Sequence, residues 1–157
     1  MTLLLALLLA CGDTVLPVED AATAPMLRKR TVTLTGGTVR ADLGGTWSRS
    51  CTPLGRMPGK GTTRCQELFF GVAPLVGTSW KPGDAIPAWV SCGSDVKNEA
   101  DCTAHLSSQK GDLTGRVVTL FEADSESGWM KAIASSKARH GLVSANKAPV
   151  MNVAKVN

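Results

Sequence analysis

The chain has 157 residues with 17 basic and 13 acidic side chains, which gives a formal net charge of +4 at pH 7. This length supports a single domain with a buried core, and the scattered bases argue against a nucleic-acid partner. With 16 Gly and 8 Pro, four Trp and no Tyr, the composition favours short strands and tight turns over long helices.

An apolar run near the start, LLLALLLA over residues 3–10, ends at Cys11. The run is far shorter than the roughly 20 residues that span a bilayer, but it matches the apolar core of about 7–15 residues in a signal peptide. Its end, Leu8-Leu9-Ala10-Cys11, resembles the lipobox of bacterial lipoproteins. This resemblance implies that residues 1–10 are a signal peptide and that the Cys11 thiol carries a diacylglycerol after cleavage.

Two other interpretations of the run stay open. Ordinary secretion with cleavage after Gly12 would also leave small residues at both recognition subsites, Ala10 and Gly12, and would remove Cys11. Alternatively, the run is a buried N-terminal strand or helix of the folded domain.

The segment that follows is predicted to be a flexible tether over residues 11–27. It is small and acidic, contains two prolines and shows no helical or strand period. Three acids and no base give it a charge of −3, so the remaining chain, with 17 bases and 10 acids, carries +7. Because Gly12 rather than Asp follows the cysteine, the resemblance to lipoprotein sorting signals implies the outer membrane.

Four cysteines remain for the folded body: Cys51, Cys65, Cys92 and Cys102. An even number in an exported protein indicates two disulfides, with three connectivities allowed. We favour the local pairs Cys51–Cys65 and Cys92–Cys102, because each closes a turn-rich loop that buries little apolar surface. The spacings lack the close cysteine pairs of zinc sites, so no metal is predicted.

The clearest predicted element is RTVTLTGGTVRADL over residues 30–43, a hairpin about Gly36-Gly37. Folding there places Leu34 opposite Val39 and Val32 opposite Ala41. One face is then apolar and the other polar, as a sheet with a single buried side requires.

Further strands are predicted by apolar runs between Gly and Pro signals. They cover residues 67–77 with a bend at Pro74, residues 85–92 at an edge because of Pro87, residues 115–123, and the tail 148–156. Together these patterns predict a single, mostly β domain over residues 28–157, built as a small antiparallel sandwich or a partly open barrel with two disulfides.

Residues 125–147 allow two interpretations. A helix would have Ser127 as its N-cap, bases late in the segment and Gly141 as its stop. The alternative is two strands, Trp129–Ala134 and Leu142–Ala145, joined by a basic loop. We favour the strands because the segment resembles the C-terminal half of a bacterial Src-homology-three-like domain. In this resemblance Gly128-Trp129 matches the Gly-Trp pair of such domains, and Gly141-Leu142-Val143 matches their Gly-Trp-Val segment.

That resemblance implies an aromatic groove for envelope peptides or glycan stems, with Trp129 as a candidate binding residue. The neighbouring bases Lys131, Lys137 and Arg139 are candidates for contact with anionic envelope polymers. An ordinary core position is the competing interpretation of Trp129. Trp80 and Trp89 could form a sugar-stacking platform, although such pairs more often pack a core.

The sequence shows no catalytic motif. It lacks a GxSxG elbow, a P-loop and an HExxH helix, and its two histidines, His105 and His140, lie far apart in the chain. We therefore expect a lipid-anchored envelope protein with a binding or structural role, no enzymatic activity and no cofactor. Its expected partners are the membrane, through the lipid, and peptidoglycan or an envelope protein. The alternatives are a secreted binding or inhibitor protein without lipid and, with less support, a small envelope hydrolase.

Overall fold

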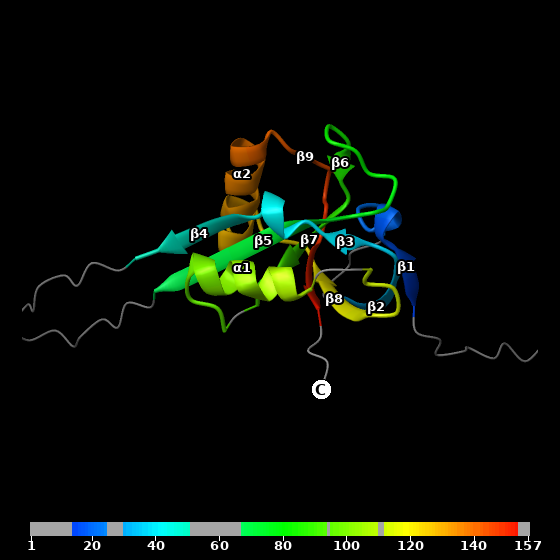
Figure 1. The fold of residues 1–157 in the computed structure, drawn as a ribbon, viewed down its shortest axis with the longest axis horizontal. Coiled ribbons are helices and arrows are strands. Elements are labelled where there is room, and N and C mark those ends of the chain that lie inside the picture. The colour runs from blue at the N-terminus through cyan, green and yellow to red at the C-terminus, as the bar shows by residue number, and fades with distance from the viewer. Residues whose placement is uncertain (1–13, 25–29, 51–66, 94, 110–111, 154–157) are drawn as a thin grey trace, which may run out of the picture.

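The computed structural model describes residues 14–24, 30–50, 67–93, 95–109 and 112–153. These form one eight-stranded sheet, a separate pair of short strands, two α-helices and two 3-10 turns (Figure 1). In chain order the elements are β1 (Val15–Pro17), η1 (Val18–Asp20), β2 (Arg30–Thr35), β3 (Thr38–Val39), η2 (Ala41–Leu43), β4 (Gly45–Arg49), β5 (Leu68–Val76), β6 (Ala85–Ile86), β7 (Ala88–Ser91), α1 (Glu99–Ser108), β8 (Val117–Phe121), α2 (Gly128–His140), β9 (Val143–Ser144) and β10 (Val150–Val153).

The prediction of a mostly β fold is confirmed, since 37% of the described residues are in strands and 25% are helical. The predicted sandwich or barrel is wrong in detail. The strands form one open mixed sheet in the order β1-β2-β8-β10-β7-β5-β3, with β4 also paired to β5. The pairs β1–β2 and β7–β10 are parallel, as is the small pair β6–β9, and the other pairs are antiparallel.

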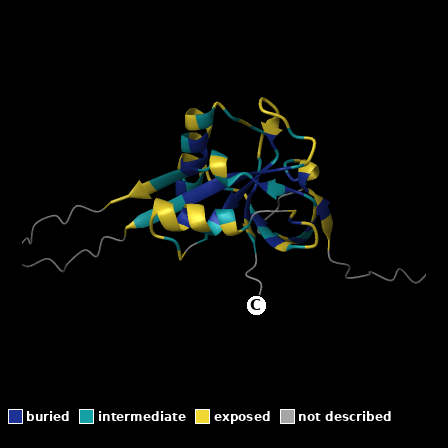
Figure 2. Cartoon of the chain, in the orientation of Figure 1, coloured by how far each residue is buried: buried dark blue, intermediate teal, exposed yellow. Residues whose placement is uncertain are grey.

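A single sheet is possible because its central strands are buried on both faces (Figure 2). Residues 71–76 of β5 and all of β7 are buried without alternation, as their continuous apolar sequence predicts. We call the two sides the α1 face and the α2 face after the helix that covers each. Ala73 and Leu75 of β5 point to the α1 face, and Val72 and Val76 point to the α2 face.

The prolines take different places in this sheet. Pro74 lies inside β5, at the point where the neighbour of β5 changes from β4 to β3. Its missing N–H therefore costs no ladder bond, and its carbonyl accepts from Arg40 N at 2.9 Å. The predicted edge position of residues 85–92 is wrong: Pro87 separates β6 from β7, and β7 lies between β10 and β5 in the middle of the sheet.

The predicted hairpin over residues 30–43 is also wrong, although both of its strands exist. Gly36 and Gly37 have φ of 82° and 110° and make the turn, but β2 and β3 do not pair. Instead β2 pairs with β8, which sets Val32 opposite Val118. This pairing has a longer apolar register than the predicted one, in which Val32 would face Ala41, a residue of η2. Register follows the partner that buries more apolar surface.

The predicted tether does not hold for residues 14–24. β1 pairs in parallel with β2, and Val18 and Ala21 are completely buried in the core of the α1 face. Leu16, on the same side, is 8% exposed. The acids of this segment, Glu19 and Asp20, lie exposed in η1. The segment therefore folds onto the sheet through its alternating apolar residues, and its acidic composition does not prevent this.

Residues 128–140 are a helix, so the two-strand interpretation favoured from the resemblance is wrong. Ser127 Oγ accepts from Met130 N at 3.3 Å as N-cap, and Gly141 ends the helix in the left-handed conformation at φ 65°. Gly128, Ala132, Ile133 and Ser136 are buried, which is the spacing of one helical face. Neither helix among the described residues is long and apolar enough to cross a membrane.

The α1 face carries the disulfide that the sequence predicts. Cys92, after β7, pairs with Cys102 of α1 with a Cα–Cα distance of 5.2 Å, and both are 1% exposed. Asn98 Oδ1 caps the same helix by accepting from Asp101 N at 2.8 Å. The other predicted pair, Cys51–Cys65, lies outside the described residues, as does Cys11.

Candidate functional site

The four candidate binding residues all lie on α2, but they do not form one surface. Trp129 is half-buried at the margin of the α2-face core, with its ring edge-on to Phe70 at 4.8 Å and to Phe121 at 5.9 Å. It also lines a cavity of about 940 Å³ that β4, β5 and the start of α1 enclose. Trp129 thus both packs against the core and forms part of a pocket wall, so its role as a binding residue stays a prediction. An α-helix has 3.6 residues per turn, so Lys131, Lys137 and Arg139 point in three different directions around α2.

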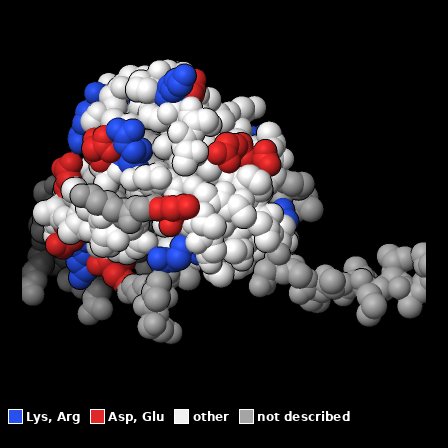
Figure 3. Space-filling model, turned by 45° about the vertical axis from the view of Figure 1, so that its right-hand side comes forward, with Lys and Arg blue, Asp and Glu red and all other residues white. Residues whose placement is uncertain are grey.

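Two of these bases already have partners. Lys131 Nζ lies 4.6 Å above the ring of Trp47, which is a cation–π contact. Arg139 forms an ion pair with Glu99 of α1 at 3.3 Å. Figure 3 shows basic and acidic side chains intermixed on the visible face, with wide uncharged areas between them. The excess of basic residues outside residues 11–27 thus forms no single basic patch on this face.

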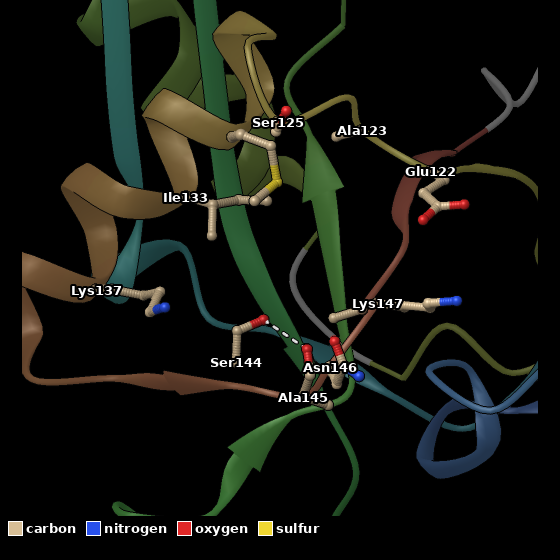
Figure 4. A pocket seen from close by; sticks show the side chains of 11 residues that line it. Glu122, Ala123, Ser125, Ile133, Lys137, Ser144, Ala145, Asn146 and Lys147 are labelled. Carbon is tan, nitrogen blue, oxygen red and sulfur yellow. Dashed lines mark hydrogen bonds between the residues drawn. The ribbon is translucent and has the colours of Figure 1, made fainter.

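Lys137 lines a different pocket from Trp129, on another side of α2. A cavity of about 430 Å³ opens beside α2, within the usual size range of ligand sites. Its walls come from α2 itself and from the chain segments before and after this helix (Figure 4). The lining residues are Glu122, Ala123, Ser125, Met130, Ile133, Lys137, Ser144, Ala145, Asn146, Lys147 and Ala148.

The floor of this pocket is held in place by the buried core. Trp89 is completely buried, and its Nε1 donates to Ser144 Oγ at 3.0 Å. Ala145 N donates to Ile86 O at 2.9 Å, which extends the β6–β9 pairing to the pocket wall. The burial of Trp89 also rules out its part in the sugar-stacking platform. A wall fixed to the core in this way is preorganised for a ligand.

Lys147 sits in a backbone conformation that side chains rarely adopt. Ala148 N donates to Ala145 O at 3.2 Å, which closes a four-residue turn. Lys147 takes the third position of that turn with φ of 59°, and it is the one non-glycine residue with positive φ among those the structure describes. Glycine or asparagine normally fills this position, and a lysine costs about 1 kcal/mol there. Such outliers cluster at functional sites.

The charges of the pocket are two ammonium groups and one carboxylate. Lys137, Lys147 and Glu122 are exposed and form no ion pair with one another or with any other described residue. Figure 4 shows Lys137 on the α2 side of the pocket and Lys147 on the opposite side. Met130 and Ile133 add apolar lining. Two ammonium groups on opposite walls suit a ligand with anionic groups.

The histidines do not join this site. Neither His105 of α1 nor His140, the last residue of α2, lines the pocket. His140 lies close enough to Asp42 to contribute to the lowered pKa of that carboxyl, but the main cause is hydrogen bonding from Arg40, with Arg40 N to Asp42 O distances of 2.6 and 2.9 Å. The carboxylate is thus engaged by an arginine.

Sequence reasoning found Lys137 and missed the opposite wall. Residues 144–148 contain Asn146 and are followed by Pro149, which is a turn signal, but nothing local marks Lys147 as its strained position. No family model, no curated protein and no solved structure matches this chain.

Proposed function

We propose that this chain is an exported protein, anchored in the bacterial envelope by a lipid on Cys11, and that its role there is binding rather than catalysis. The observation that carries export is the apolar run ending in Leu-Leu-Ala-Cys. The buried Cys92–Cys102 disulfide supports it, because disulfides persist in oxidising compartments. By resemblance to lipoprotein sorting, the outer membrane is the destination.

The experiment is intact mass spectrometry of the protein expressed in a Gram-negative host. Loss of residues 1–10 together with a gain of acyl mass is the expected result. A mature N-terminus at Asp13 without acyl mass would replace this proposal by its alternative, a secreted soluble binding or inhibitor protein. An uncleaved Met1 would contradict export by either route.

The binding role is proposed for the pocket beside α2. Its support is a pair of lysines that have no ion-pair partner among the described residues, one of them in a strained turn, on the walls of a pocket that Met130 and Ile133 also line. The ligand class proposed is an envelope polymer with anionic groups, such as peptidoglycan with its carboxylate-bearing peptide stems. A hydrolase is less well supported, because no histidine lines the pocket.

The test is retention on purified peptidoglycan sacculi across a salt series. We expect Lys137→Gln with Lys147→Gln to lower retention, and the wild-type protein to lose retention as salt rises, since screening acts over about 10 Å at 0.1 M salt. Lys131→Gln is the matched control, because its ammonium lies on Trp47 outside the pocket. An equal loss in the control and the double variant would assign the binding to general charge and remove the pocket from the proposal.

A further inference from the structure

The α2 face of the sheet is covered at one end and bare at the other. α2 packs on β4 and β5, and Phe121, at the end of β8, joins the aromatic cluster under the helix. At the other end of β8, and across β2 and β1, neither described α-helix lies over the sheet (Figure 1). The described side chains of these strands on this side, Val15, Thr31, Thr33 and Val117 among them, are uncharged.

Two exposed valines lie on this bare end, one on each side of Thr33. Val15 of β1 is in register with Thr33 of β2, and Thr33 is in register with Val117 of β8, so the three side chains form one row on one face. Val15 is 57% exposed and Val117 is 45% exposed. Only Met130 and Val143 are comparably exposed among the large apolar side chains of the described residues, and both lie at the α2 and β9 end.

This row is close in the chain to the proposed lipid. Val15 is four positions after Cys11, and four residue steps span at most about 14 Å when fully extended. A diacylglycerol on Cys11 would thus hold β1 within this distance of the bilayer. Tethering raises the local concentration of the surface at the bilayer, so a small apolar row suffices to select an orientation that it could not hold alone.

We propose that the bare end of the α2 face, the row Val15–Thr33–Val117, rests on the lipid bilayer. The proposal depends on the lipid at Cys11 proposed above. The flanking outward residues of β2, Thr31 and Thr35, are uncharged and β-branched. On this face of β2, therefore, no charged side chain has to be dehydrated at contact, since Arg30 is on the side of Val32 and Leu34. Val143 lies in β9, which is apart from β1, β2 and β8, so it is not part of this row (Figure 1).

The experiment adds one tryptophan at a time to the full-length lipidated protein. Val117→Trp and the matched control Val143→Trp are placed in phosphatidylcholine vesicles with or without brominated acyl chains, which quench nearby tryptophans. The added emission at position 117 should shift to the blue and lose most of its intensity in brominated vesicles. The added emission at position 143 should do neither. Thr33→Trp, in the middle of the row, repeats the measurement if Val117→Trp does not fold.

The intact mass of the same preparation separates the two proposals. An acylated protein with no quenching at 117 and 33, or with equal quenching at 143, would overturn the membrane-facing row and leave the anchor standing. A protein without acyl mass would overturn the anchor and the row with it. Acyl mass with quenching confined to the row would support both.

Discussion

The packing on the α1 face of the sheet is mostly aliphatic and includes one disulfide. The packing on the α2 face is mostly aromatic and does not extend over β1 and β2. On the α1 face, Val18 of η1, Leu106 of α1 and Met151 of β10 meet in one closed cluster. On the α2 face, Trp89, Trp129 and the rings around them leave both a pocket and a bare row. We infer that the α1 face carries stability and that the incompletely closed α2 face carries recognition.

Each face also depends on one glycine that lets the sheet approach its cover. A Cβ at Gly45 of β4 would lie 2.6 Å from Ser136 Cβ and 2.5 Å from Ala132 O, inside the backbone of α2. A Cβ at Gly71 of β5 would collide with the sulfurs of Cys92 and Cys102. The obstacle is helix backbone on the α2 face and a disulfide on the α1 face, and this difference can be tested.

The largest effect is expected from Gly45→Ala. α2 cannot move away from β4 without losing Ile133 and Ala132 from the core, so we expect a loss of about 3 kcal/mol in the free energy of unfolding. Urea unfolding followed by circular dichroism measures it. Ser48→Ala, at an exposed position of the same strand, is the control and should change little. A loss below the control's would mean that α2 does not pack closely on β4.

Next in size is the disulfide of the α1 face. Replacing both Cys92 and Cys102 by Ala should cost about 2–3 kcal/mol, the value expected for a crosslink that closes a loop of this length. The same unfolding experiment, with and without reductant on the wild-type protein, checks it. No change on reduction would show that the aliphatic cluster alone holds α1 in place.

Gly71→Ala sharpens that result through a double-mutant cycle. In the wild-type background the new methyl meets the sulfurs, and in the background without both cysteines it enters the space they leave. We therefore expect Gly71→Ala to be far less destabilising in the second background. Equal costs in the two backgrounds would contradict the placement of the disulfide over Gly71.

An element of either face can be predicted from the sequence when its signal lies within a short stretch of chain. The apolar run of β5, the strand at β8 and the Cys92–Cys102 pair are local features, and they were predicted. Ser127 and Gly141, the cap and the stop of α2, are local signals too, and they predict the helix correctly where the resemblance to a strand-rich domain does not. A cap and an apolar spacing of one helical face are satisfied together only by a helix.

The remaining features depend on partners far away in the chain. Val32 pairs with Val118 and not with its neighbour across the Gly36-Gly37 turn, because the longer register buries more apolar surface. Val18 enters the core only because β1 finds β2 as a parallel partner. The pocket wall at Lys147 likewise exists only once β9 has paired with β6. Local patterns predict strands and faces, but they do not predict which strands meet.

The two helix caps offer a smaller comparison of the faces. Asn98 caps α1 with a 2.8 Å bond and also donates from Nδ2 to Asp101 Oδ2 at 2.6 Å, whereas Ser127 caps α2 with a single 3.3 Å bond. Substitution of either residue by Ala should cost about 1 kcal/mol, with Asn98→Ala the larger loss. Thermal unfolding of the two variants side by side tests the order, and a larger loss in Ser127→Ala would reverse it.

Lys147→Gly tests whether the strained backbone conformation of Lys147 serves ligand binding at the cost of stability. Glycine adopts φ of 59° without steric cost, so the variant should be more stable by up to about 1 kcal/mol. Retention on sacculi should fall at the same time. Asn146→Gly, in the same turn, separates backbone effects from loss of the ammonium. Unchanged retention in Lys147→Gly would remove this lysine from the proposed site.

The smallest expected effect is at Asp42, near the edge where the two faces meet. Arg40 stacks on Trp80 of the α2 cluster at 5.7 Å, and its ion pair with Asp42 lowers the pKa of that carboxyl through hydrogen bonding and charge. Since the folded pKa lies below the unfolded value near 3.9, the pair stabilises the fold above about pH 4 and loses its effect as the pH falls through the folded pKa.

Asp42→Asn should therefore lower stability at pH 7 and leave it unchanged at the acid end of the range. The pair is largely exposed, with 38% of the Arg40 side chain and 60% of the Asp42 side chain accessible, so about 0.3 kcal/mol is expected. Urea unfolding of the wild type and the variant between pH 2 and about 7 measures the difference. Adding Arg40→Gln should abolish the pH-dependent part, because the carboxyl then loses the partner that lowers its pKa. A difference that instead grows as the pH falls would show that Asp42 is stabilised in its protonated form, contrary to its contact with Arg40.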